Sequence, residues 1–486
     1  MEQDLSDLLP KFRGFRNALA PIHKLPPEIL SRIPQFFPIR DLVVATHVCR
    51  YWRTTLISSG PLWCNIDSAG PEAFTCLHRS KGSPIHVRVR KIPDDELLTR
   101  LSPHIGRIKS LVLKSRWSVA QTVFARFTDP APNLETLTVI CHPSTAAAGP
   151  VPSTLLTGDL PKLRSFTLQG LASDLENFVL PNLTYFEMSS VTSSPISITL
   201  TNLLAFLERS PLLETARIDF HGECIHDAPK QKMVSLKALR TLYISGSGLV
   251  GHGDNSLLAR LELPKGVDAT VTLLIPDGSA IPTAYAIPPY PDRLPFISGV
   301  KRIHAEVFPG HGRCNFRFSG ENGKITITAR WPALFPDLNG LLIGSIRSFL
   351  PLSTDGVEEF YIQGYQAPGD SYLPALRAFE SLPNLQSILM LHCDNTVLLR
   401  ALRQPTRHLA VPKLRKMKLY LGWGTEVSGD ELRELASYRA SRDARLEELL
   451  ITSPEVIVPV REVMALREHV KLVEYKMDSS IPTLED

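Results

Sequence analysis

IHKLPPEILSRIPQFFPIRDLVVATHVCRYWRTTLISSGPLWCNI, residues 22–66, is a short apolar stretch that is densely punctuated by proline. Residues 25–28 (LPPE) are predicted to begin a helix. Proline presets the backbone of a first helical turn, and the glutamate there meets the positive end of the helix dipole. Ile29, Leu30 and Ile33 then form one apolar face at helical spacing.

A second helix is predicted from Asp41, which is a good N-cap residue. Apolar residues recur through this helix at steps of three and four: Leu42, Ala45, Cys49, Trp52 and Leu56. Three valines, Val43, Val44 and Val48, widen the stripe beyond what one face can bury in so small a unit. A single core below about 40–60 residues is marginal. The excess of apolar residues therefore favours packing against a further helical partner, supplied by this chain or by another.

One interpretation of this stretch is an N-terminal helical cap on a larger domain. Its submotifs LPPEIL, DL, VCRYWR and PLW also resemble, in that order, an F-box. In that family the module docks on a Skp-type adaptor, which links it to a cullin–RING ubiquitin ligase. By motif match, the resemblance implies eight residues that form or support the adaptor-binding surface: Leu25, Pro26, Ile29, Leu30, Leu42, Val48, Cys49 and Trp52.

Pro34 departs from the F-box pattern, because the family usually has an apolar helix residue at this position. A proline inside a helix removes a backbone hydrogen bond and costs ~3 kcal/mol. The first helix is therefore expected to end near Ile33.

Composition narrows the class of protein. The 486 residues have 43% hydrophobic and 21% charged residues, typical of a globular chain. The net charge of +4 is too small, and too little interleaved with aromatic residues, to favour nucleic-acid binding. No stretch approaches 18 consecutive apolar residues and no signal peptide is recognised, so no membrane association is expected. Seven scattered cysteines without a CxxC indicate a reducing compartment, cytoplasmic or nuclear.

A repeat of the form apolar-x-x-apolar-x-apolar accounts for most of the remaining chain. Its copies in the first half are Ile108/Leu111/Leu113, Leu134/Leu137/Val139, Leu163/Phe166/Leu168, Leu183/Phe186/Met188, Leu213/Ala216/Ile218 and Leu239/Leu242/Ile244. Its copies in the second half are Val357/Phe360/Ile362, Leu385/Ile388/Met390, Leu414/Met417/Leu419 and Leu446/Leu449/Ile451. The pattern resembles degenerate leucine-rich repeats, in which each short strand buries its apolar face only against neighbouring units.

The predicted fold class is α/β: a small all-α, three-helix F-box-like module followed by an irregular leucine-rich-repeat solenoid, similar to fungal F-box-like proteins. The predicted limits are residues 1–20 for a lead, 21–67 for the F-box-like domain, 68–104 for a connecting segment and first strand, 105–455 for the solenoid, and 456–486 for a cap and tail. Helical returns are expected at residues 202–209, 376–380 and 431–439.

The periodicity is irregular at about residues 265–345, which are predicted to be widened or inserted repeats. Leu258/Leu261/Leu263 and Val300/Ile303/Ala305 still fit the unit. A proline-rich run at residues 275–296 is a candidate surface loop. Residues 314–318 and 324–328 flank GENG and predict a β-hairpin.

Catalytic and metal-binding patterns are weak. Residues 246–251 (GSGLVG) form a GxGxxG after a predicted strand, but the loop continues where a dinucleotide site needs a helix N-terminus. His304, His311 and Cys314 match no standard zinc spacing. We therefore expect no enzyme activity, no cofactor and no metal site.

A binding surface is the remaining functional feature. Residues that alternate with the buried positions of a repeat strand face outward, and their mixture of charge and tyrosine suits protein recognition. The predicted target-binding residues are Glu187, Arg217, Asp219, Tyr243, Tyr361, Lys418 and Tyr420.

The resemblance thus implies a substrate-recognition subunit of an SCF-type ubiquitin ligase. Its partners would be a Skp-type adaptor, through it a cullin, and an unidentified target protein. The alternatives are a ligase-independent scaffold and, less favoured, a nucleotide-dependent enzyme that uses residues 246–251.

Overall fold

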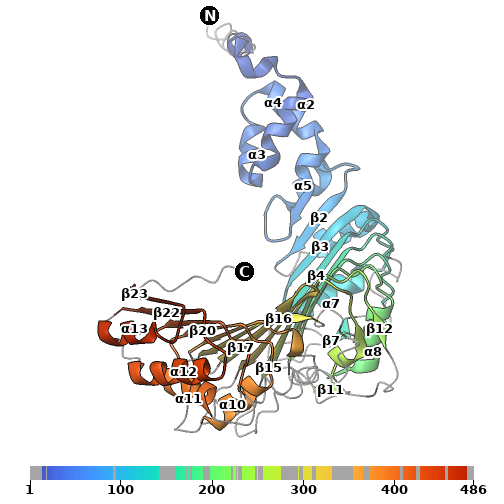
Figure 1. Cartoon of the computed structure of the whole chain (residues 1–486). Coiled ribbons are helices and arrows are strands. Elements are labelled where there is room, and N and C mark those ends of the chain that lie inside the picture. The colour runs from blue at the N-terminus through green and yellow to red at the C-terminus, as the bar shows by residue number, and fades with distance from the viewer. Residues whose placement is uncertain are drawn as a thin grey trace, which may run out of the picture. The chain divides into compact units, whose positions relative to one another are not determined.

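The computed structural model describes most of the chain (Figure 1). The described residues are 12, 14–17, 19–90, 95–141, 150–151, 160–170, 172–173, 175, 178–189, 197–220, 223–225, 227, 233–246, 249, 256–274, 294, 299–308, 313–330, 354–364, 372–404, 409–422, 427–454 and 458–478. The chain forms two compact units, residues 1–187 and 188–486.

The first unit begins with short helices. They are η1 (Pro21–Lys24), α2 (Pro27–Arg32), η2 (Ile33–Phe36), α3 (Ile39–Ala45), α4 (Arg50–Ser58) and η3 (Gly60–Trp63). The α-helix α2 ends at Arg32, one residue before the expected end, and Pro34 lies in the 3₁₀ turn that follows. The effect predicted for this proline is confirmed.

The second helix is divided differently from the prediction. The apolar pattern from Asp41 to Leu56 is split between α3 and α4, and Pro38 rather than Asp41 is the N-cap of α3. Cys49 is the N-cap of α4, and its sulfur accepts the backbone N–H of Trp52 at 3.5 Å. The prediction of one helix was wrong because the apolar residues keep their spacing of three and four through residues 46–49, where α3 has ended and α4 has not begun.

A mostly parallel sheet follows in the first unit. Its strands are β1 (Asn65–Asp67), β2 (Ile85–Val89), β3 (Ile108–Ser115), β4 (Thr136–Cys141), β6 (Ser165–Gln169) and β8 (Tyr185–Ser189). Pairing is parallel from β1 to β2, β3, β4 and β6 in chain order. The connections contain α5 (Ala73–Arg79), α6 (Asp95–Leu101), η4 (Ser102–Arg107), α7 (Trp117–Arg126) and the short parallel pair β5 (Pro150–Val151) and β7 (Ala172–Ser173).

The second unit has the same plan. Its main strands are β10 (Thr215–Asp219), β13 (Thr241–Ser245), β15 (Val267–Leu274), β16 (Val300–Phe308), β17 (Arg313–Gly320), β18 (Gly323–Arg330), β19 (Glu359–Gln363), β20 (Ser387–Leu391), β21 (Lys416–Tyr420), β22 (Glu448–Ser453) and β23 (Leu472–Met477). Its helices are α8 (Leu200–Glu208), η8 (Leu258–Arg260), η13 (Thr354–Gly356), α10 (Leu373–Glu380), α11 (Asn395–Arg403), α12 (Gly429–Ser441) and α13 (Val460–Leu466). Figure 1 shows α10 to α13 together along one side of β19–β23.

Short strands form outer ladders in the second unit. They are β9 (Ser197–Thr199) with β11 (Glu223–Ile225), and β12 (Val234–Ser235) with β14 (Leu261–Glu262). The repeat unit predicted at Leu258/Leu261/Leu263 therefore corresponds to η8 and an outer strand. The strand that pairs with β13 in the sheet is β15, so this assignment was wrong.

The irregular region contains an antiparallel insertion between parallel strands. β17 pairs antiparallel with both β16 and β18, while β15–β18 and β16–β19 are parallel. The predicted hairpin is confirmed, with Gly320 opposite Gly323 at its turn. The proline-rich run at 275–296 lies outside the described residues, except for Leu294.

The repeat pattern predicts the core correctly. None of the thirty apolar residues in the ten predicted units is more than 3% exposed. Each unit contributes a strand of the sheets, and the predicted helical returns correspond to α8, α10 and α12. The α/β class, with a helical module followed in the chain by repeat strands and helical returns, is confirmed.

Candidate functional site

The helical module has a small core of its own. Leu30 and Leu56 are fully buried, and Leu42 is 2% exposed. The Tyr51 hydroxyl donates to the carbonyl oxygen of Leu25 at 2.8 Å, which ties α4 to the start of α2. These contacts fix the three helices against one another and decide which apolar side chains remain outside.

The same module leaves an unusual number of apolar side chains exposed. Of the seventeen large hydrophobic residues exposed in the described part of the chain, ten lie between residues 12 and 48. They are Phe12, Phe15, Leu19, Ile22, Ile29, Ile33, Phe36, Phe37, Val44 and Val48. Apolar surface gathered in this way marks an interaction site far more often than singly exposed residues do.

The predicted adaptor-binding residues fall into two groups. Leu30, Leu42 and Trp52 are buried, while Leu25 and Cys49 are half-buried. Pro26, Ile29 and Val48 are exposed, with Val48 59% and Ile29 44% accessible. The buried residues can therefore only support the surface from beneath, while the exposed ones can contact a partner.

Sequence reasoning missed the most exposed aromatic residue of the module. Phe36 is 89% exposed, and its neighbour Phe37 is 40% exposed. The available signal was the pair of adjacent phenylalanines between Pro34 and Pro38, which lies outside the helical apolar spacing. Val44, which is 66% exposed, belongs to the valine surplus that the pattern did reveal.

The module is packed directly against the start of the first unit's sheet. Trp63 is fully buried, and its indole Nε1–H donates to the carbonyl oxygen of Leu56 at 2.8 Å. The guanidinium of Arg79 lies 4.4 Å from the centre of the Trp63 ring. A Cβ at Gly60 would lie 2.7 Å from the carbonyl oxygen of Ser80, so only glycine allows this close approach.

The predicted target-binding residues alternate with the core residues of the repeat strands, but Tyr361 is only 8% exposed. In the second unit, one cross-strand row contains, in order, Arg217, Tyr243, Thr270, Thr326, Arg317, His304, Tyr361, Leu389, Lys418 and Leu450. We call these residues the central row. It brings together four predicted residues, Arg217, Tyr243, Tyr361 and Lys418.

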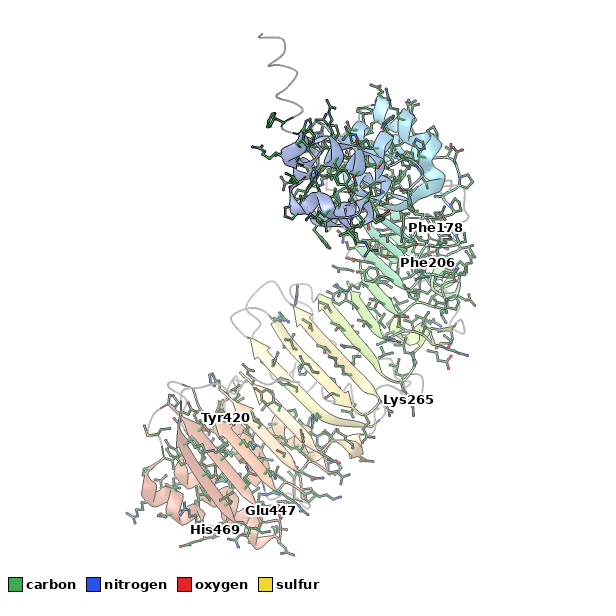
Figure 2. The ribbon with its side chains drawn as sticks, turned by 90° about the horizontal axis from the view of Figure 1, so that it is seen from above. Phe178, Phe206, Lys265, Tyr420, Glu447 and His469 are labelled. Atoms are coloured by element: carbon green, nitrogen blue, oxygen red, sulfur yellow. The ribbon has the colours of Figure 1, made fainter. Side chains whose placement is uncertain are left out.

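The other predicted residues of this set lie elsewhere. Asp219 and Tyr420 are two positions further along β10 and β21. Figure 2 shows Tyr420 and Glu447 near opposite ends of the neighbouring strands β21 and β22. Glu187 belongs to the first unit, where its carboxylate accepts from Gln169 Nε2 at 2.9 Å and from the Tyr185 hydroxyl at 2.6 Å.

The antiparallel insertion adds an ordered polar network to the open face. Asn315 Nδ2 donates to Glu306 at 2.9 Å, while Asn315 Oδ1 accepts from Arg313 at 3.0 Å and from Thr328 at 3.1 Å. His304 Nε2 lies 3.4 Å from Glu306 Oε1. These bonds link β16, β17 and β18 and hold the polar side chains of the insertion in place.

His304 and Tyr361 form the centre of the row. Their rings meet edge to face with centroids 3.9 Å apart. Burial lowers the pKa of His304, with Glu306 acting in the opposite direction and Arg317 in the same direction. Burial also raises the pKa of Tyr361, and Glu306 adds to that effect. Both rings are therefore neutral near pH 7.

In the glycine loop, residues 246–251, packing explains why the first residue is glycine. Gly246 has φ +114°, and a Cβ there would lie 1.7 Å from the carbonyl oxygen of Phe220. Glycine is thus required for the approach of two backbone segments. Of residues 247–251, only Leu249 is described, so the rest of the motif lies outside the described residues.

The described part of the chain shows no metal site and no membrane-spanning helix. There, no group of three or more His, Cys, Asp or Glu side chains is placed to hold a metal ion. His304 and Cys314 lie on opposite faces of their strands, since Cys314 is fully buried, and His311 is outside the described residues. No described helix is long and apolar enough to cross a membrane.

Comparisons with known proteins support the division of the chain. Residues 22–68 match a family model described as F-box-like. F-box/LRR-repeat protein 8 of Mus musculus is 32% identical over 107 residues, which are 20% of this chain and 29% of the relative. The match thus spans less than a third of that curated relative. The resemblance of the helical module is confirmed, and the mostly parallel strand array is consistent with leucine-rich repeats.

Proposed function

We propose, starting from the F-box-like domain at residues 22–68, that the chain is the substrate-recognition subunit of an SCF-type cullin–RING ubiquitin ligase. The domain binds a Skp-type adaptor, and the adaptor connects it to a cullin. The observation that carries this proposal is the concentration of exposed apolar side chains between residues 12 and 48. Their removal from water, at roughly 25 cal/mol per Å² of apolar surface, drives the association.

The adaptor surface uses exposed and buried residues differently. Pro26, Ile29 and Val48 contact the adaptor, together with Phe36 and Val44, which the motif match did not include. Leu30, Leu42 and Trp52 hold the helices that present them, while Leu25 and Cys49 lie at the edge of the buried part.

The chain supplies no catalytic group in this proposal. Its open face holds a target protein through Arg217, Asp219, Tyr243, Tyr361, Lys418 and Tyr420, with Glu187 on the first unit. Holding the target close to a ubiquitin-loaded enzyme raises the effective concentration of the reacting groups, and this accounts for the acceleration. All seven cysteines are free thiols, which fits a cytoplasmic or nuclear assembly.

Co-expression with a Skp-type adaptor, followed by size-exclusion chromatography, tests the proposal. The full chain is expected to co-elute with the adaptor, whereas Val48→Asp and Phe36→Asp are expected to elute alone. Leu212→Asp is the matched control, because Leu212 is 50% exposed but lies in the second unit. Equal behaviour of all three variants would contradict an adaptor site on the helical module.

A ligase-independent scaffold is the second candidate, and the early end of α2 at Arg32 favours it. In that case the wild-type chain and Pro34→Leu both fail to bind the adaptor. Restored binding in Pro34→Leu alone would instead identify Pro34 as the cause of a weakened adaptor site.

A further inference from the structure

The open face of the second unit has two kinds of cation. Lys324, Arg302 and Lys416 all stand near the start of their strands, which are β18, β16 and β21. Each has a carboxylate partner on a neighbouring strand: Lys324–Asp268 at 3.0 Å, Arg302–Glu359 at 2.8 Å and Lys416–Glu448 at 3.5 Å. We call these six residues the paired row. Its charges cancel within the sheet.

The central row differs from the paired row in charge. It holds three permanent cations, Arg217, Arg317 and Lys418, and no acidic residue between β10 and β22. Among the residues that the structure describes, neither Arg217 nor Lys418 has a carboxylate within ion-pair distance. Charge is therefore left available at Arg217 and Lys418.

The cations of the central row are evenly spaced. Arg217 is four strands from Arg317, and Arg317 is four strands from Lys418. With neighbouring strands ~4.8 Å apart, each interval is about 19 Å, and the whole row is about 38 Å long. An extended segment of about twelve residues covers that length.

Apolar and aromatic side chains fill the positions around the cations. Lys418 lies between Leu389 and Leu450 in the register, and Arg217 lies beside Tyr243. The two leucines offer apolar contact area to a bound segment whose carboxylate reaches the Lys418 ammonium. The row thus combines sparse positive charge with apolar contact area.

We propose that the central row binds an extended acidic segment of a target protein that lies across the strands. This inference rests on the proposed function, in which the repeat sheet holds the target, and it adds the chemistry of that target. A nucleic acid is disfavoured, because its phosphates recur every few ångströms whereas the row offers a cation only about every 19 Å.

A fluorescent peptide of about twelve residues, with glutamate at both ends and in the middle and serine elsewhere, tests the inference by anisotropy with the full chain. The chain is expected to bind this peptide more tightly than a lysine–serine peptide, and added salt is expected to weaken the binding. Arg217→Glu and Lys418→Glu are each expected to weaken binding about fivefold, since they reverse a charge on the row.

Lys416→Glu is the matched control, because Lys416 lies on the same strand as Lys418 but belongs to the paired row. It is expected to change the affinity less than twofold, with unaltered circular dichroism in every variant. Equal weakening by Lys416→Glu would overturn the assignment to the central row. Tighter binding of a single-stranded oligonucleotide of the same length would overturn the choice of partner.

The two proposals fail separately. A chain that co-elutes with the adaptor but does not bind the acidic peptide keeps the proposed ligase role and overturns this inference. A chain that binds the peptide but not the adaptor loses the ligase role, while the acidic-segment site stands.

Discussion

Trp63 donates its indole N–H to the carbonyl oxygen of Leu56 at 2.8 Å, and both side chains are fully buried. The bond joins the last helix of the F-box-like domain, α4, to the residues that lead into strand β1. The helical module therefore shares its core with the beginning of the sheet in the first unit. The stability of the helical module, and the position in which it meets a partner, therefore depend on this shared core.

Substituting Trp63 tests this packing. Trp63→Phe removes the donor and leaves a gap, so we expect the free energy of unfolding of the first unit to fall by ~2 kcal/mol. Chemical denaturation followed by circular dichroism measures the change. Phe36→Ala is the control, because an 89% exposed side chain should contribute less than about 0.5 kcal/mol. Equal stability of Trp63→Phe and the wild type would show that the joint is not part of the core.

Arg439 supports a second prediction, in the other unit. It is fully buried on α12, and its guanidinium donates to the carbonyl oxygens of Val411 at 3.0 Å, Leu414 at 3.2 Å and Ala410 at 3.4 Å. Burial lowers the pKa of Arg439 to about 10, so the side chain is still charged at neutral pH.

Arg439→Lys keeps the charge but loses the planar fork of donors, and we expect it to cost about 2–3 kcal/mol of unfolding free energy. Arg442→Lys, at an exposed position three residues later, is expected to change little. The two denaturation midpoints give the comparison. A midpoint for Arg439→Lys as high as that of Arg442→Lys would refute a specific role of the fork.

Asn395 supports a prediction of increased stability. It is 2% exposed at the start of α11, and in the described part of the structure neither its Oδ1 nor its Nδ2 has a hydrogen-bond partner. Replacing a buried unsatisfied amide by an apolar side chain removes a desolvation cost. Asn395→Leu is therefore expected to raise the unfolding free energy by ~1 kcal/mol, measured by thermal denaturation. A lower melting temperature would mean that the amide is satisfied or that leucine does not fit.

Cysteine reactivity gives a prediction that depends on pH. Burial raises the pKa of Cys76, Cys141 and Cys224 to about 11 and that of Cys314 to about 12, so almost no thiolate forms at these sites at pH 8. Cys49 is the half-buried exception among the seven thiols. We expect iodoacetamide at pH 8 to label Cys49 first, as read by peptide mass spectrometry, and a bound adaptor to slow that labelling. Faster labelling of a buried thiol would contradict the described packing.

The sequence was most informative where one physical rule decides the structure. A unit such as Leu385/Ile388/Met390 has only one face that can be buried, so spacing alone predicts strand β20 and its core side chains. Leu258/Leu261/Leu263 has the same spacing but belongs to η8 and an outer strand. Spacing does not say which of two nearby segments, this one or β15, pairs with β13.

In the candidate sites, too, spacing predicts the face of a residue but not which strands pair. Tyr361 and Lys418 could be placed on the open face because they alternate with predicted core residues. His304 and Arg317 were not predicted as binding residues. The repeat pattern does not contain the antiparallel strand β17, whose pairing with β16 sets Arg317 opposite His304. Cys49 was assigned to a helical face but is an N-cap, since the apolar spacing runs unbroken through the turn before it.

Hydrogen–deuterium exchange of the full chain with and without a Skp-type adaptor tests the central claim most directly. The account predicts slower exchange across α2, α3 and α4, residues 27–58, and unchanged exchange in β19–β23 when the adaptor is bound. Protection confined to the repeat strands, or no protection at adaptor concentrations that saturate other F-box-like domains, would contradict it.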